Sequence, residues 1–241
     1  MELKINKNNL TLKEHGFTLI EILITMAITG IISTALFVSF QSQQKSYVVQ
    51  ENVAAMQQNL RAGMDMMVRE IRMAGYDPYG GSAGAGITIA VVDGNNNSTI
   101  EFTIVADDDG DDNNNDGTTD ETGELKTIKY EIYDAYGDGR NDLGRQVGSS
   151  ASTKRAVSEN IDALEFFYTL LDGSKTLTPD PALVRSVQIT LLARVERGDK
   201  DFDSGDRTYA RPSEETNWGP YTDNFRRRLL TTTVKCRNMG L

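Results

Sequence analysis

The hydrophobic and polar positions divide the start of the chain into contrasting stretches. Residues 1–16 are polar and mildly basic, and they end at Gly16. Residues 17–40 are almost entirely apolar and hold one charged side chain, Glu21. A helix rises about 1.5 Å per residue, so a helix over this stretch is long enough to cross the roughly 30 Å hydrocarbon core of a bilayer. The pattern therefore predicts a membrane-spanning helix that starts at Phe17.

Beyond residue 40 the chain turns polar, but apolar residues still recur at every third or fourth position. The residues on this stripe are Val49, Val53, Met56, Leu60, Met64, Met67, Ile71 and Ala74. That spacing places them on one face of a helix, and Gly75 followed by Pro78 marks its end. We expect one helix from Phe17 to about Ala74, whose amphipathic second half, residues 41–75, lies under a globular head. The methionines of the stripe are expected to fill the core rather than to bind a metal.

The pattern after Gly75 is that of strands. The strand candidates are the runs Ile87–Val92, Ser98–Val105, Leu125–Asp134, Ile161–Leu170, Leu183–Glu196 and Leu229–Cys236. These runs are rich in β-branched residues or alternate between apolar and polar positions. We expect an α+β fold in which the long N-terminal helix packs on an antiparallel sheet of about four to six strands, with the β-rich head spanning residues 76–241.

Composition narrows the function classes. The chain of 241 residues has 35 Asp and Glu against 25 Lys and Arg, a net charge of −10. Nucleic-acid binding needs a basic surface, so we expect no nucleic-acid partner. With one Cys, the chain cannot form an internal disulfide. With one His, it has too few histidines for a His-rich zinc site, and a Ser-His-Asp triad would depend on that single residue. We find no catalytic constellation and expect a protein that is not an enzyme.

The position of the small residue Gly16 suggests an unusual processing site. A secretory signal has its small-residue cleavage site after the apolar stretch, whereas Gly16 precedes it. Cleavage there would remove a leader peptide, residues 1–16, and leave Phe17 as the new N-terminus. A carboxylate such as Glu21 costs about 3 kcal/mol inside a membrane and needs a partner. The α-amino group of Phe17, in the same chain or a neighbouring copy, is one candidate; alternatively, Glu21 only reaches toward the membrane interface.

The leader junction reads Lys13-Glu14-His15-Gly16-Phe17-Thr18-Leu19-Ile20-Glu21. This run resembles the class III leader junction of type IV pilins and type II secretion pseudopilins. The resemblance implies that a prepilin peptidase cuts between Gly16 and Phe17 and that Phe17 is N-methylated. It implies a role in assembly for Glu21, which docks on the N-terminus of the neighbouring subunit. It also implies a single-pass protein of the bacterial inner membrane, in contact with its lipid, with the head in the periplasm and a later place in the pilus, its base or its tip.

The head carries further similarities. The matching segments are Arg72–Tyr76, Val157–Ile161, Leu164–Tyr168, Val184–Ile189 and Thr233–Asn238. They resemble the head of PilW-type minor pilins, which implies a role in the initiating or tip complex of a type IV pilus with other minor and major pilins as partners. J-type pseudopilins of type II secretion share much of this layout and remain an alternative. No proline interrupts the helix, which argues against a bulk filament subunit. Cys236 departs from the pattern, and we interpret it as a small buried hydrophobe.

An acidic insertion, residues 107–124, lies between two strand candidates. Within it, residues 112–120 follow the pattern D-x-N-x-D-G-x-x-D, which matches positions 1, 3, 5, 6 and 9 of an EF-hand loop. The candidate Ca²⁺ ligands are Asp112, Asn114, Asp116 and Asp120. Position 12 is Gly123 instead of Glu, so a solvated acidic loop is the alternative. Weaker candidate groups are Asp134, Asp138 and Asp142, and Asp199, Asp201 and Asp203. A calcium-binding module or pilus-tip adhesin is accordingly a further alternative function.

Residues 198–225 form a long polar stretch that nevertheless contains aromatic side chains, namely Tyr209, Trp218, Tyr221 and Phe225. Long segments of this kind inside a compact domain are usually functional or disordered. The aromatic residues fit two interpretations equally well, a contact patch for another subunit and a lid over the sheet.

Overall fold

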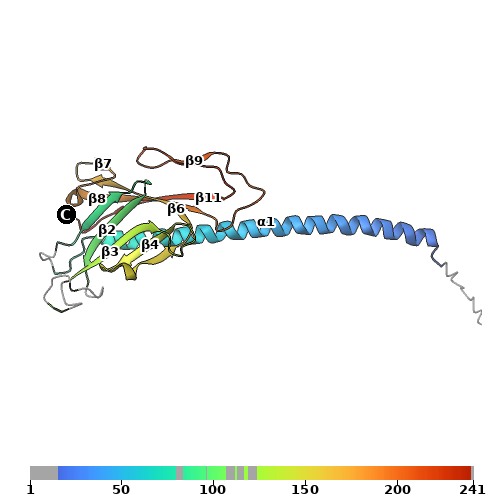
Figure 1. The fold of residues 1–241 in the computed structure, drawn as a ribbon, viewed down its shortest axis with the longest axis horizontal. Helices are drawn as coiled ribbons and strands as arrows, with labels where there is room; N and C mark the ends of the chain where they lie inside the picture. The colour runs from blue at the N-terminus through green and yellow to red at the C-terminus, as the bar shows by residue number, and fades with distance from the viewer. Residues whose placement is uncertain are drawn as a thin grey trace, which may run out of the picture. The chain divides into compact units, whose positions relative to one another are not determined.

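The computed structural model describes residues 16–79, 84–95, 97–106, 112, 117–118 and 124–239. The chain forms two compact units, Met1–Val48 and Val49–Leu241. Helix α1 (Leu19–Met73) contributes to both units (Figure 1). The helix begins two residues later than the predicted start at Phe17, because Thr18 serves as its N-terminal cap.

The strands of the head form two main sheets. One is an antiparallel sheet in chain order, made of β1 (Ile87–Val92), β2 (Ser98–Val105), β3 (Leu125–Tyr133), β4 (Asp142–Val147) and β5 (Arg155–Ser158). The other has the order β11–β8–β6–β7 and consists of β11 (Arg227–Lys235), β8 (Val184–Arg194), β6 (Ile161–Leu170) and β7 (Lys175–Thr176). Both sheets are antiparallel throughout.

Three shorter features complete the described part of the head. A small ribbon pairs β9 (Arg207–Tyr209) with β10 (Trp218–Tyr221). Short 3₁₀ turns span Ala151–Thr153 and Pro181–Leu183, and the second is capped by the Asp180 side chain. The expected α+β fold is confirmed, but the expectation of a single sheet of four to six strands is wrong. Strand alternation does not reveal where one sheet ends and the next begins, because that depends on non-local pairing.

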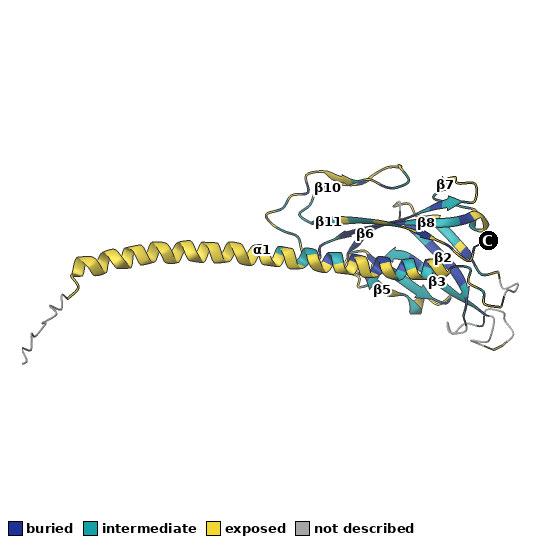
Figure 2. Cartoon of the chain, turned by 180° about the vertical axis from the view of Figure 1, so that it is seen from behind, coloured by how far each residue is buried: buried dark blue, intermediate teal, exposed yellow. Residues whose placement is uncertain are grey.

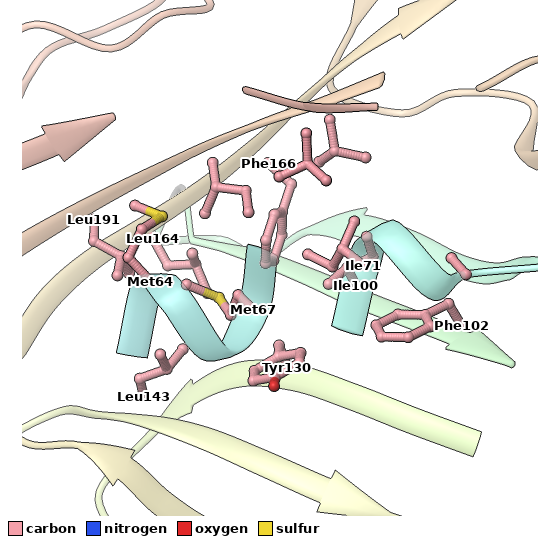
Figure 3. Packing of buried hydrophobic residues seen from close by; sticks show 14 of the residues in the cluster. Met64, Met67, Ile71, Ile100, Phe102, Tyr130, Leu143, Leu164, Phe166 and Leu191 are labelled. Carbon is pink, nitrogen blue, oxygen red and sulfur yellow. The ribbon is translucent and has the colours of Figure 1, made fainter. Parts of the chain in front are cut away.

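The main core lies between the two sheets and one face of α1. The buried helix residues are Met56, Leu60, Met64, Met67, Ile71 and, just beyond the helix, Ala74. In Figure 3, Tyr130 and Leu143 of the five-stranded sheet lie on one side of the helix, and Phe166 and Leu191 of the other sheet lie on the opposite side. The predicted stripe is therefore confirmed as core from Met56 onward, whereas Val49 and Val53 are only half-buried.

A polar cluster ties the helix to the five-stranded sheet. The Tyr130 hydroxyl donates to Glu70 Oε2 at 2.5 Å, and Arg145 Nη2 and Nε donate to Oε1 and Oε2 of the same carboxylate at 2.7 and 2.9 Å. Burial, followed by the neighbouring Glu70 charge, raises the pKa of Tyr130. A two-pronged guanidinium–carboxylate contact fixes direction as well as distance, so it fixes the position of the helix against β3 and β4.

Candidate processing and assembly site

The chain enters α1 through an open, non-helical segment. Gly16 and Phe17 precede the first helical residue, and Phe17 is 86% exposed. A methyl group added at Gly16 would meet no atom within 4 Å. The bond between Gly16 and Phe17 is therefore accessible, and its backbone is not held in the helical hydrogen-bond ladder.

Thr18 and Glu21 form a reciprocal cap at the start of the helix. The Glu21 amide donates to Thr18 Oγ1 at 3.3 Å, while the Thr18 amide and hydroxyl each donate to Glu21 Oε2 at 2.8 Å. This is the capping-box pattern of a threonine followed three residues later by a glutamate. The spacing Thr18-x-x-Glu21 is the sequence signal for it, and our sequence interpretation did not use that signal.

The cap uses only one of the two carboxylate oxygens of Glu21. Both bonds from Thr18 end on Oε2, whereas Oε1 accepts no hydrogen bond from any described residue. The side chain is also exposed. Cleavage after Gly16 would leave the Thr18 amide intact, so the cap and a contact from Oε1 to an amino group are chemically compatible.

The apolar residues that follow Glu21, up to Phe40, form a surface that no other described part of the chain covers. Every described residue from Gly16 to Val48 is exposed, as the yellow first half of α1 shows in Figure 2. Within the described residues, α1 is the one helix long and apolar enough to cross a membrane, and its most apolar window has a mean hydropathy of 2.1. Two of its hydroxyls bond inside the helix, that of Thr25 to the Ile22 carbonyl and that of Thr34 to the Gly30 carbonyl. This satisfies them without water.

Comparisons with known proteins agree with this geometry. Residues 11–37 match the family model of the prokaryotic N-terminal methylation motif. In structure, the chain is similar to a type IV-like pilin from Thermus thermophilus, with a TM-score of 0.50 and 17% sequence identity over 76% of this chain and 97% of that one. The chain therefore combines a pilin-like fold with a prokaryotic N-terminal methylation motif. A search of curated proteins finds no match.

The motif and the pilin-like fold are features of structural proteins rather than of enzymes. The methylation motif implies processing by a prepilin peptidase, and the matched residues 11–37 include Gly16, Phe17 and Glu21. The leader motif and the apolar helix are consistent with a pilin anchored in the inner membrane and destined for a pilus.

Most of the predicted calcium loop falls outside the described residues. Asn114, Asp116 and Asp120 lie outside them, and only Asp112 is described. Its Oδ2 accepts a hydrogen bond from the Gly117 amide at 2.9 Å, five residues further on. Among the described residues, no group of three or more His, Cys, Asp or Glu side chains is placed to hold a metal ion.

In the first of the two weaker candidate groups, the carboxylates of Asp134 and Asp142 accept hydrogen bonds from nearby backbone amides. Asp134 accepts amide hydrogen bonds from Gly137 and Gly139 at 2.7 and 2.8 Å, and these backbone bonds lower its pKa. Asp142 accepts from the amides of Asn160 and Ala135. Asp134 and Asp142 therefore hold the β3–β4 connection, and Asp142 also holds the turn between β5 and β6.

In the second group, Asp199 forms an ion pair with Arg226 at 2.8 Å. Asp203 Oδ1 accepts from the Gly205 amide at 3.0 Å. Asp199 therefore joins the beginning of the polar stretch to its end, whereas Asp203 shapes a local turn.

Residues 198–225 act as a lid over the outer face of the four-stranded sheet. Trp218 is only 5% exposed and packs on Ala163 of β6 and Leu192 of β8, with Tyr209, Tyr221 and Leu229 around it. The stretch leaves the sheet after Val195 and returns at Arg226, whose carbonyl accepts from the Val195 amide. Of the two interpretations of its aromatic residues, the packing of Trp218 and Tyr221 supports the lid.

A fully buried ion pair fastens this lid. Arg211 Nε donates to Glu165 Oε2 at 2.6 Å, and neither side chain has any exposed surface. Ser213 adds two donors to the same carboxylate, its amide to Oε1 and its hydroxyl to Oε2. Sequence reasoning missed this cluster, because 46 residues separate its members and only the fold brings them together.

Cys236 packs as the sequence interpretation proposed. It is 5% exposed and belongs to the main core. Desolvation raises the pKa of its thiol to about 11. A buried neutral thiol of this kind behaves as a small hydrophobe rather than as a nucleophile.

Proposed function

We propose that this protein is a PilW-type minor pilin that enters the initiating or tip complex of a type IV pilus after cleavage at Gly16 and N-methylation of Phe17. Its partners in this role are the prepilin peptidase, other minor and major pilins and inner-membrane lipid. The observation that carries the proposal is the start of α1. A carboxylate with one free oxygen lies at the head of an uncovered apolar helix, within a methylation motif spanning residues 11–37.

The head supports the PilW-type assignment through the segments that resemble that group. Leu164–Tyr168 lies in β6 and Val184–Ile189 in β8, and their buried apolar side chains belong to the main core. Thr233–Asn238 closes β11 and returns to the end of α1, where Asn238 donates to the Met73 carbonyl at 3.4 Å. The resemblance thus lies in the residues that build one sheet and join it to the helix, and not only in surface loops.

The helix favours a minor rather than a bulk subunit. It runs from Leu19 to Met73 as one α-helix, and the first proline of the chain is Pro78. Many bulk pilins carry a helix-bending proline in the apolar half. Proline removes a helical hydrogen bond and bends the helix, so this helix lacks the bend that a proline would introduce.

A J-type pseudopilin of type II secretion is the alternative with the same anchor. A clean deletion of the gene separates the two when surface filaments are counted by electron microscopy and secreted proteins are assayed in the same cultures. Loss of filaments with secretion intact is the expected result, and a plasmid copy of the gene should restore the filaments. Intact filaments with blocked secretion would assign the chain to type II secretion instead.

We also propose, as a second candidate property, that the acidic loop binds Ca²⁺ through Asp112, Asn114, Asp116 and Asp120, as in a calcium-binding module or adhesin. Supporting it is the Gly117 amide bond to Asp112, which joins positions 1 and 6 of the EF-hand pattern. Calorimetric titration of the full chain with Ca²⁺, repeated on Asp112→Ala/Asp116→Ala, tests it. Absence of heat with the unmutated protein would refute the idea.

A further inference from the structure

Strand β11 is an open edge of the four-stranded sheet. It pairs with β8 on one side, and no described strand lies on its other side. The Val195 amide donates to the Arg226 carbonyl, and the Cys236 amide donates to the Arg185 carbonyl. In an antiparallel ladder the bonded positions alternate, so the even-numbered residues between them face β8. The odd-numbered residues point their N–H and C=O groups away from the sheet.

The outward positions are open over the C-terminal half of the strand. Thr231, Thr233 and Lys235 are all exposed, and their backbone groups bond to no described residue. Toward the other end, the Arg227 side chain is only 3% exposed because it is held by Asp162 and Asp223 near the lid. The accessible edge therefore runs from Thr231 to Lys235, and such a row of unpaired groups is a template for another strand.

The charged side chains of β11 and of the residues that follow it are all positive, although the whole chain has a net charge of −10. Residues 226–241 contain four Arg, one Lys and no acidic residue. Arg228, Lys235 and Arg237 are exposed and form no ion pair with any described residue. Charge complementarity therefore favours a partner strand that carries carboxylates at its ends.

The same charges disfavour a second copy of this chain. Two β11 strands paired antiparallel along the accessible edge, about Thr233, would bring the exposed cations Arg228, Lys235 and Arg237 of both copies close together. Like charges at such short range repel one another. The edge is therefore better suited to a different chain than to itself.

We propose that the β11 edge from Thr231 to Lys235 binds an extended, acidic segment of another protein as an added β-strand. Backbone hydrogen bonds to Thr231, Thr233 and Lys235 provide the binding, and Lys235, Arg237 and Arg228 select carboxylates. This surface belongs to the head alone, so the inference is independent of leader processing and of the machine in which the protein works.

The test uses the full chain in detergent micelles and a fluorescent synthetic peptide with alternating threonine and valine in the middle and glutamates at both ends. Fluorescence anisotropy should show saturable binding, and a peptide with lysines in place of the glutamates should bind roughly tenfold more weakly or not at all. Equal binding of the two peptides, or no binding of either, would overturn the proposal.

Two substitutions at one position separate the backbone from the side chain. Thr233→Pro removes an outward N–H without touching the ladder to β8, since proline is tolerated at such edge positions. It should weaken binding roughly tenfold, whereas the matched control Thr233→Ala should leave it nearly unchanged. Equal affinity of the two variants would rule out strand addition.

A charge variant provides the test should Thr233→Pro fail to fold by circular dichroism. Lys235→Glu/Arg237→Glu keeps the backbone intact and should bind the acidic peptide at least several-fold more weakly, with the preference moving toward the lysine peptide. An unchanged preference contradicts the proposal. Self-association of the chain that Thr233→Pro abolishes would assign the edge to a second copy and also overturn it.

Discussion

At the scale of single residues, the lid depends on one buried charge. Glu165 lies in β6 on the face opposite the core, where a carboxylate would normally meet water. The lid removes that water and supplies Arg211 at 2.6 Å, with Ser213 as a second donor. A buried carboxylate whose cation is removed costs about 3–5 kcal/mol, so this contact determines whether the lid can stay closed.

We therefore expect Arg211→Met to destabilise the head by up to about 3–5 kcal/mol, or to release the lid so that water reaches Glu165. Urea unfolding of the full chain in detergent measures the first effect, and hydrogen exchange of residues 198–225 measures the second. The control is Arg197→Met, which removes an exposed contact to Glu196 and should change stability by less than about 0.5 kcal/mol. Unchanged stability and exchange in Arg211→Met would contradict this role of the ion pair.

The buried thiol of Cys236 makes stability depend on pH in the alkaline range. Its pKa is raised from 9.0 to about 11 in the folded protein, so the unfolded chain loses this proton first. The free energy of unfolding should therefore fall as the pH rises from about 9 to 11.

Between pH 8 and 10.5 the thiol should account for a loss of about 1–2 kcal/mol. Comparing urea unfolding of the unmutated protein with that of Cys236→Val, which lacks the titrating group, isolates this contribution. An identical pH dependence of the two proteins would show that the thiol is not buried as described.

At the scale of elements, the close approach of α1 to the sheet rests on Gly63. A Cβ there would lie 2.9 Å from Ser158 Cβ and 3.1 Å from Leu143 Cδ2. Ser158 also donates its hydroxyl to the Asn59 carbonyl, one helical turn earlier, at 3.0 Å. Glycine lowers helix propensity by roughly 1 kcal/mol relative to alanine, so its presence here is explained by packing and not by helix formation.

Gly63→Ala should consequently lower the stability of the head by about 1–3 kcal/mol, despite the better helix propensity of alanine, because the added methyl overpacks the interface. Gly30→Ala is the matched helical control, since a Cβ there meets nothing within 4 Å. Thermal unfolding followed by circular dichroism compares the two. A stabilised Gly63→Ala variant would mean that the helix and sheet can separate slightly at no cost.

The elements that sequence reasoning found are those with a strong local pattern. The runs Ile87–Val92, Ser98–Val105 and Ile161–Leu170 coincide with β1, β2 and β6, because β-branched and aromatic residues recur in them. The strands β4 and β5 were missed. Residues 142–147 hold a glycine and charged side chains, and their pairing with β3 and β5 holds them extended.

The candidate site shows the same division between local and non-local information. The predicted processing and assembly residues lie within a few positions of one another, and the motif at residues 11–37 includes them. The Arg211–Glu165 pair and the open edge at β11 depend on which segments become neighbours in the fold. No periodicity along the chain encodes those neighbours, so they could not be predicted from the sequence.

At the scale of the whole molecule, Glu21 has two possible functions that its geometry allows us to separate. Through Oε2 it caps the helix, and through Oε1 it is free to accept a contact from another subunit. Glu21→Ala removes both functions. Glu21→Gln removes the negative charge but keeps an oxygen that can accept from the Thr18 amide, so it preserves the cap.

If the charge serves assembly, both variants should be cleaved by the prepilin peptidase and accumulate in the membrane, yet neither should enter filaments. Immunoblotting of the leader-dependent size shift and of sheared surface filaments measures the two steps separately. Gly16→Val is the control for processing, because it should block cleavage itself, and Glu14→Ala should change neither step. Normal assembly of Glu21→Gln with failure of Glu21→Ala would mean that the carboxylate acts only as a helix cap, and normal assembly of both would remove Glu21 from the assembly mechanism altogether.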